Sequence, residues 1–153
     1  MKTSLGEIEA VDIRTVWDSE PADFTPWLAE PANIAILSRT LGLDLEVQAQ
    51  EKPVGLFRAD ILCKDLSADI PDTFVLIENQ LERSDHGHLG QLLTYASGLD
   101  TAIIIWITPK FCDEHREAVD WLNRITDERF KFFAIQLARS STSNRRAHVR
   151  HFA

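Results

Sequence analysis

The chain has 153 residues, of which 44% are hydrophobic, and this is enough for one domain with a single core. Its net charge of −8 argues against sequence-independent sliding along DNA, although carboxylates gathered around a metal ion would themselves make the chain acidic. No apolar run approaches the roughly 20 residues that span a membrane, and the first residues lack the apolar stretch of a signal peptide, so we expect a cytoplasmic protein with no membrane partner.

The first half of the chain predicts one helix followed by a β-hairpin. Pro31 suits the first turn of a helix, and apolar residues three or four positions apart follow it as far as Gly42, a typical stop signal. Residues 45–50 then alternate apolar and polar side chains, as a strand with one buried face does. A turn at residues 53–55 leads into a second strand at residues 56–63, which we expect to pair with the first.

In the second half, buried strands alternate with helices. Ser84 or Asp85 can cap a helix that ends at Gly98. A further amphipathic helix is predicted at residues 113–125, with Ala118, Trp121 and Leu122 facing inward. The predicted strands are residues 73–78, 101–108 and 130–137, all rich in apolar side chains.

This order of elements predicts an α/β fold. One helix, three strands, a helix, a strand, a helix and a last strand favour a mixed central sheet of about five strands flanked by helices. Residues 1–138 would form this domain. Residues 139–153 contain four arginines and no acidic residue, and we interpret them as a basic, flexible tail. The abrupt change of composition there would also fit a truncated or frame-shifted C-terminus.

Three polar residues mark the ends of two neighbouring predicted strands. Asp60 is a charge inside a strand otherwise rich in apolar residues, Glu78 ends the next strand, and Gln80 lies two residues further on. Residues two apart in an extended strand project from the same face, so Glu78 and Gln80 would share one space that Asp60 could reach. Two carboxylates that converge repel each other unless a cation lies between them or one holds a proton. We therefore expect an acidic pocket suited to a divalent metal.

A resemblance to a known family rests on these residues and on the helix that follows. Gln91 and Tyr95 are four positions apart and share a helix face. A strand with Asp, a strand ending in Glu-x-Gln and a helix with Gln-x-x-x-Tyr together resemble the PD-(D/E)XK nuclease superfamily. The stretch IENQLERSDHGHLGQLLTYASGLD is similar to a signature of bacterial nuclease-like proteins of uncharacterised function. The resemblance covers about residues 5–137 and implies a restriction-endonuclease-like αβββαβ core.

The resemblance also implies a role for each of these residues. Asp60 and Glu78 would hold Mg²⁺ or Mn²⁺ together with the main-chain carbonyl of Asn79. The ion would lower the pKa of a water molecule and stabilise charge on the scissile phosphate. Gln91 would orient the attacking water or a phosphate, and Tyr95 would brace the site.

The superfamily pattern leaves two positions open in this chain. Gln80 stands where the superfamily usually has a lysine, and an amide can neither carry a positive charge nor take up a proton at ordinary pH. Members of the superfamily often add a carboxylate from their first helix. Glu30, just before that helix, is the candidate here, and Glu46 and Glu51 are the alternatives.

Histidines near the predicted pocket have two interpretations. His86 or His88 could contact nucleic acid or replace the missing lysine as a base. Alternatively, Asp85 caps the helix and both histidines face solvent, which is the interpretation we favour. A zinc site formed by Asp85, His86 and His88 would lack an obvious fourth ligand. His115, on a predicted surface helix, is assigned no role.

Cysteines and tryptophans are assigned structural places. Cys63 and Cys112 match no metal-binding spacing, so we expect reduced thiols. Trp106 and Trp121 are expected in the core. Trp17 and Trp27 could stack bases, but packing of the N-terminal segment on the sheet is the use we favour.

Three functional hypotheses follow from the sequence. The first is a metal-dependent nuclease, an endonuclease or exonuclease acting on DNA in restriction, repair or defence. The second is a nuclease-like domain that binds nucleic acid or a protein partner without hydrolysis. The third is a protein–protein module, such as a homodimer, whose polar pocket is a relic. The lysine replacement favours the second hypothesis, and the combination of Asp60, Glu78, Gln91 and Tyr95 favours the first.

Overall fold

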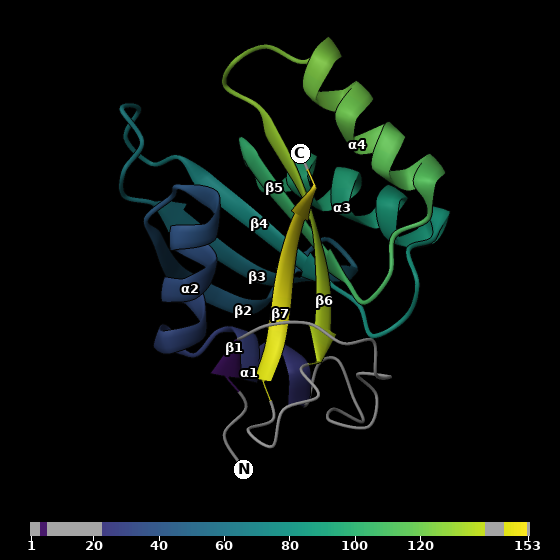
Figure 1. The fold of residues 1–153 in the computed structure, drawn as a ribbon. Coiled ribbons are helices and arrows are strands. Elements are labelled where there is room, and N and C mark those ends of the chain that lie inside the picture. The colour runs from purple at the N-terminus through teal and green to yellow at the C-terminus, as the bar shows by residue number, and fades with distance from the viewer. Residues whose placement is uncertain (1–3, 6–22, 140–145, 153) are drawn as a thin grey trace.

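One mixed β-sheet with helices on both faces forms the body of the protein (Figure 1). The computed structural model describes residues 4–5, 23–139 and 146–152. In chain order the elements are β1 (Ser4–Leu5), α1 (Thr25–Leu28), α2 (Pro31–Leu41), β2 (Leu45–Val54), β3 (Phe57–Asp65), β4 (Phe74–Asn79), α3 (His86–Gly98), β5 (Ile103–Thr108), α4 (Asp113–Ile125), β6 (Lys131–Arg139) and β7 (Arg146–Phe152).

The sheet has the order β1-β7-β6-β5-β4-β3-β2. Strands β2, β3 and β4 form an antiparallel meander, and β4, β5 and β6 run parallel to one another, each joined to the next by a helix. The five predicted strands are β2 to β6, so the predicted mixed sheet flanked by helices is confirmed. Parallel neighbours need long crossover connections, and α3 and α4 supply them.

The two strands beyond β6, β7 and the edge strand β1, were not predicted. Strand β7 pairs antiparallel with β6, with Gln136 opposite Arg150, and β1 pairs parallel with β7. Residues 146–152 therefore form a strand, where the sequence predicted a flexible tail. The apolar residues that alternate there, Ala147 and Val149, are too few among the basic residues to indicate a strand. The physical reason for the strand is that β6 would otherwise leave one edge of its backbone without a partner strand. The domain boundary after residue 138 stays a prediction.

Local signals in the sequence set the ends of the helices. Pro31 is the first residue of α2, and Gly42 ends that helix in the left-handed conformation, with a φ of 69°. Asp85 caps α3 by accepting a hydrogen bond from the His88 amide. These start and stop signals confirm the predicted helices.

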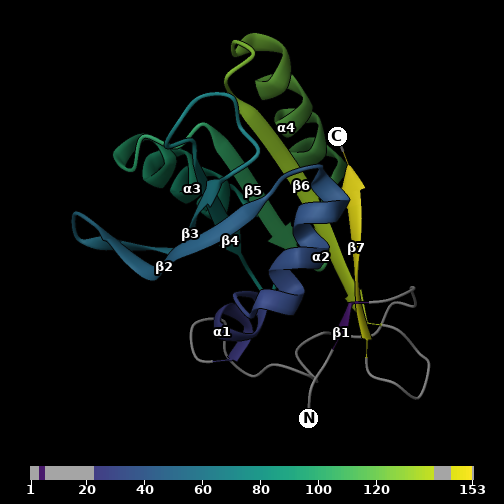
Figure 2. The same ribbon diagram turned by 90° about the vertical axis from the view of Figure 1, so that its left-hand side faces the viewer.

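Helices cover the two faces of the sheet separately (Figure 2). On one face α1 and α2 pack through Trp27 and Leu37 against Ile77. On the other face α3 and α4 pack through Leu92 and Val119 against Trp106. The expected burial of Trp27 and Trp106 is confirmed, whereas Trp17 lies outside the described residues.

The buried face of α4 differs from the prediction. Trp121 is 52% exposed, whereas His115 and Val119 are buried and Leu122 is half-buried. Positions 115, 119 and 122 follow the helical period, so the inward stripe begins at a histidine. Within the described part of the chain, no helix combines the length and apolar character needed to cross a membrane.

Candidate functional site

Asp60 and Glu78 lie side by side on neighbouring antiparallel strands. Strands β3 and β4 pair with Ile61 opposite Ile77, so Asp60, which precedes Ile61, comes beside Glu78, which follows Ile77. The Asp60 amide donates a hydrogen bond of 3.0 Å to Glu78 Oε1, and the Asn79 amide donates one of 2.8 Å to Asp60 Oδ2. Each carboxyl group is therefore held by the backbone of the other strand.

Burial and mutual repulsion make the two carboxyl groups a coupled pair. Glu78 is 4% exposed. Burial raises the pKa of Glu78 to about 9, and the negative charges of Asp60 and Glu51 add to the effect. A hydrogen bond between the side chains of Glu78 and Asp60 favours the protonated form in the same direction. In the absence of a cation, the raised pKa favours a proton on Glu78 at neutral pH, which is one of the two ways of relieving the repulsion that the sequence predicted.

Glu51 is the third carboxylate of this region. It has a φ of 51°, which is unusual for a residue with a side chain, and lies beyond a register shift between Val47 and Ala49 in β2. Its Oε1 is buried without a hydrogen-bond partner among the described residues. Because its charge acts on Glu78, Glu51 belongs to the same electrostatic environment.

The other two alternatives for an added carboxylate have different surroundings. Glu30 is exposed, precedes α2 and makes no capping hydrogen bond. Glu46 is exposed on β2, opposite Lys64 in the register, and its carboxylate accepts a hydrogen bond from Gln48. Glu51, by contrast, is partly buried, and its charge adds to the raised pKa of Glu78.

Helix α3 presents Tyr95 to the carboxyl pair. Tyr95 is buried, and its pKa is raised by burial first and then by the charges of Glu78 and Asp60. Gln91 lies one turn earlier on the same helix face and is exposed. The structure therefore brings Tyr95 to the pair and leaves Gln91 at the surface beside it, and the roles of both residues stay predictions.

Gln80 is fully enclosed and fully hydrogen-bonded. Its exposed fraction is 0%, and its Oε1 accepts a hydrogen bond of 2.7 Å from the Trp106 indole. Its Nε2 donates to the Arg83 carbonyl and, at 3.4 Å, to Asp85. Trp106 lies opposite Glu78 in the register, so the amide of Gln80 is on the face of Glu78 as predicted, and there it ties the end of β4 to Trp106 and to the loop before α3. A catalytic role for Gln80 stays a prediction.

Histidines at the start of α3 are held by protein contacts. His88 Nδ1 lies 2.9 Å from both oxygens of Asp85, and these contacts help to lower the pKa of Asp85. His86 Nδ1 lies 2.7 Å from His115 Nε2. The expected Asp85 cap is confirmed. His86 is exposed as expected, although its ring contacts His115, whereas His88 is half-buried against Asp85. Among the described residues, no three His, Cys, Asp or Glu side chains are arranged to hold a metal ion.

A buried cluster around His115 was not predicted from the sequence. His115 Nδ1 lies 2.8 Å from both Ser84 Oγ and Cys112 Sγ. Burial, followed by the nearby His86, lowers the pKa of His115. The one available signal was the three-residue spacing of Cys112 and His115 across the start of α4. This cluster joins the starts of α3 and α4.

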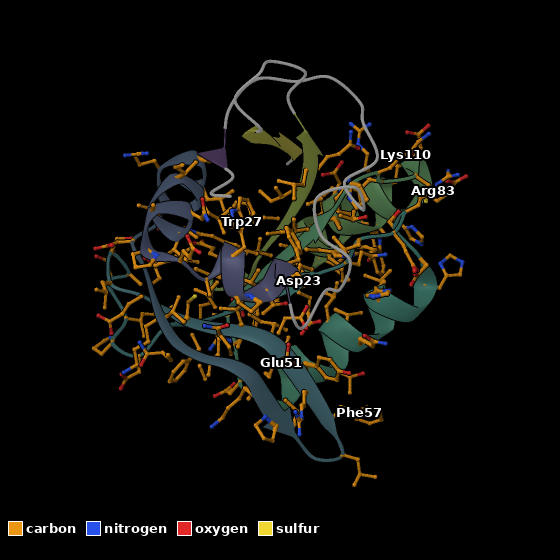
Figure 3. All side chains as sticks on the ribbon, turned by 90° about the horizontal axis from the view of Figure 1, so that it is seen from below. Asp23, Trp27, Glu51, Phe57, Arg83 and Lys110 are labelled. Carbon is orange, nitrogen blue, oxygen red and sulfur yellow. The ribbon has the colours of Figure 1, made fainter. Side chains whose placement is uncertain are left out.

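Two basic side chains, Arg83 and Lys110, lie on one side of Glu51, and Phe57 lies on the other (Figure 3). Arg83 and Lys110 belong to neighbouring loops, which are joined by a hydrogen bond from the Ser84 amide to the Lys110 carbonyl. A depression of about 740 Å³ lies elsewhere, at the amino ends of β4, β5 and β6, and none of the predicted site residues lines it.

Comparisons with known proteins give two slight structural likenesses. No family model matches the chain, and no curated protein matches its sequence. The chain is similar to a repair endonuclease from Pyrococcus abyssi, with 17% identity and a TM-score of 0.48 over 67% of this chain. It is also similar to EndoMS in a complex with dsDNA, with 16% identity and a TM-score of 0.48 over 71% of this chain. The chain spans 45% of each of those two chains, and likeness at this level assigns no function.

Proposed function

We propose that this chain is a metal-dependent nuclease that hydrolyses phosphodiester bonds of DNA. The observation that supports it most is the buried pair of Asp60 and Glu78, whose carboxyl groups are held together by the opposing backbones. Juxtaposed buried carboxyl groups are destabilising without a proton or a cation, so a fold that keeps them together has a use for the arrangement. A divalent cation at such a place can promote hydrolysis of a phosphodiester by stabilising charge on the phosphate and activating water.

The oxygen donors of this region are of the kind that a hard divalent ion prefers, although Asp60, Glu78 and Glu51 are not gathered around one ion position in the described structure. Asp60, Glu78 and the carbonyl of Asn79 would hold Mg²⁺ or Mn²⁺, which prefer oxygen ligands. The orphaned Oε1 of Glu51 supports that residue, rather than Glu30 or Glu46, as the additional carboxylate. When bound, the ion would supply Lewis-acid stabilisation of the charge that develops on the phosphate.

Residues of α3 would position the other groups of the reaction. Gln91 is exposed on the helix face that carries Tyr95, so its amide is available to orient water or a phosphate oxygen. The Tyr95 ring would close the apolar side of the pocket and brace Glu78. His86 and His88 are the candidates for contact with nucleic acid, because both lie at the start of the same helix.

Cleavage assays with matched variants test the proposal. Purified protein with Mn²⁺ or Mg²⁺ should cut single- or double-stranded DNA, and Asp60→Asn and Glu78→Gln should each reduce the rate at least about 100-fold. Glu46→Gln is the control, because it removes an exposed carboxylate from β2 without touching the pair. The absence of cleavage of every substrate with either metal, in a protein that is folded, would contradict the proposal.

The second candidate function is nucleic-acid binding without hydrolysis. Gln80 favours it, because a buried amide engaged with Trp106, Arg83 and Asp85 cannot act as the base that a lysine would supply. This candidate predicts binding that persists without divalent metal and is unaffected by Glu78→Gln. Metal-dependent cleavage by the wild-type protein, with none by Glu78→Gln, would exclude this second function.

A further inference from the structure

The turn between β2 and β3 exposes two adjacent large apolar side chains. Leu56 is 98% exposed and Phe57 is 58% exposed. Figure 3 shows this hairpin extending away from the body of the sheet, with Phe57 near its end. Single apolar residues on a surface are common, but two in succession at the end of a projecting hairpin form a contact element that nothing in the described part of the chain covers.

The two strand residues that flank the turn, Val54 and Phe57, pack on helix α3 and leave Leu56 as the freely projecting side chain. Val54 packs against the core cluster of α3, and a Cβ added to Gly98 would lie 2.6 Å from Val54 Cγ1. The Phe57 ring lies 6.0 Å from the Tyr95 ring, measured between centroids. Since Tyr95 also faces the carboxyl pair, the hairpin has a set position relative to Asp60, which follows Phe57 by three residues.

Charge identifies the kind of partner. Residues 52–59 include Lys52 and Arg58 and no acidic residue, although the whole chain has a net charge of −8. Arg58 lies opposite Pro53, the neighbour of Lys52, so Lys52 and Arg58 project from opposite faces of the hairpin, and both are exposed. Between the carboxylates of Glu51 and Asp60, the hairpin end thus carries one basic side chain on each face beside its apolar residues, which complements the phosphates on either side of a stacked base step.

We propose that the hairpin tip, residues 52–58, is a wedge that enters nucleic acid bound at the carboxyl pair. Leu56 and Phe57 pack against bases and unstack one step, while Lys52 and Arg58 contact the flanking phosphates. The inference rests on the proposed function to the extent that the pair of Asp60 and Glu78 faces a nucleic acid. It adds that the substrate is recognised through a step that can be opened, such as a flexible or unpaired one.

Binding measured without divalent metal tests the wedge separately from catalysis. The probes are DNA duplexes carrying 2-aminopurine, with and without an unpaired base, and the wild-type protein should raise the fluorescence and prefer the unpaired site. Leu56→Ser and Phe57→Ser should weaken binding about 5- to 50-fold, the range expected for losing one base contact, and abolish the fluorescence change. Arg58→Gln should reduce the salt slope by about one.

Ile70→Ser is the matched control, because Ile70 is exposed to the same degree as Phe57 but lies in the loop between β3 and β4. Its binding and fluorescence should equal those of the wild-type protein. Equal affinity of all variants would overturn the wedge even if cleavage occurs, whereas tip-dependent binding without cleavage would uphold it while the proposed hydrolysis fails. Loss of self-association or of binding to anionic vesicles in Leu56→Ser, with DNA affinity unchanged, would assign the tip to another partner and overturn the inference.

Discussion

Among the candidate site residues, Glu78 has a pKa far above its ordinary value. Burial, and then the charge of Asp60, raises the pKa of this carboxyl from 4.5 to about 9. The folded protein therefore holds a proton that the unfolded chain releases between these two values. The free energy of unfolding is therefore highest, as far as Glu78 is concerned, below pH 4.5, and it falls as the pH rises from 4.5 to about 9.

Glu78→Gln should remove this loss, because an amide resembles the protonated carboxyl. In buffer with a chelator, the variant and the wild-type protein should unfold with similar free energies near pH 5. At pH 8 the variant should be more stable by at least about 1 kcal/mol. Denaturant unfolding at several pH values measures the difference, and a difference that does not change with pH would contradict the assigned acidity.

His115 should act on stability in the opposite pH direction. Burial and His86 lower its pKa below 6.5, while Asp85 and Glu114 act against this shift. The unfolded chain therefore binds a proton more readily than the folded protein, and stability is lost as the pH falls below 6.5. His115→Gln should be less stable than the wild-type protein at pH 7.5, and the gap should narrow toward pH 5. Urea unfolding checks this, and a gap that widens on acidification would count against it.

At the residue scale, sequence reasoning found the carboxyl pair but not its surroundings. Asp60 and Glu78 stand out because each is a charge in an apolar strand. The position of Glu51 depends on a register shift and a positive φ, neither of which a local pattern reveals. The contact of Gln80 with Trp106 joins residues from different strands, so the amide could be placed only by the fold.

Helix α3 carries Gln91 and Tyr95 on one face. Substitutions of its glycines test how closely the hairpin packs against the helix. Gly98 faces Val54, whereas Gly90 has nothing within 4 Å of an added Cβ. Gly90→Ala should therefore stabilise the protein by about 0.5–1 kcal/mol through helix propensity.

Gly98→Ala should instead destabilise the protein by about 1–2 kcal/mol, because the new methyl group meets Val54. Thermal unfolding measures both effects, and faster hydrogen exchange of residues 52–58 in Gly98→Ala alone would report displacement of the hairpin. The same stability change in both variants would show that the hairpin does not pack closely against Gly98.

Elements were predicted well wherever the hydrophobic pattern is local. The alternation in β2 and the proline and glycine that bound α2 each lie within a short window. Helix α4 was placed correctly but rotated, because treating His115 as a surface residue moved the expected inner face toward Trp121. Strand β7 was missed since its pairing with β6 supplies backbone hydrogen bonds that a basic composition does not disclose.

At the scale of the whole molecule, basic residues occur in the hairpin and in the loops that adjoin the strands of the carboxyl pair. The chain is acidic overall, yet Lys52 and Arg58 lie on the hairpin, and Arg83 and Lys110 lie in the loops after β4 and β5. The carboxyl pair occupies the sheet between these elements. Under the proposed function, these basic residues would contact the phosphates of nucleic acid bound at the pair.

Anomalous scattering from crystals soaked in Mn²⁺ tests the central claim most directly. We predict one Mn²⁺ ion bound by carboxylate oxygens of Asp60 and Glu78, with the hydrogen bond between the two side chains broken and the signal absent in Glu78→Gln. A fully soaked crystal in which the two side chains remain hydrogen-bonded to each other, with no manganese beside them, would contradict the account.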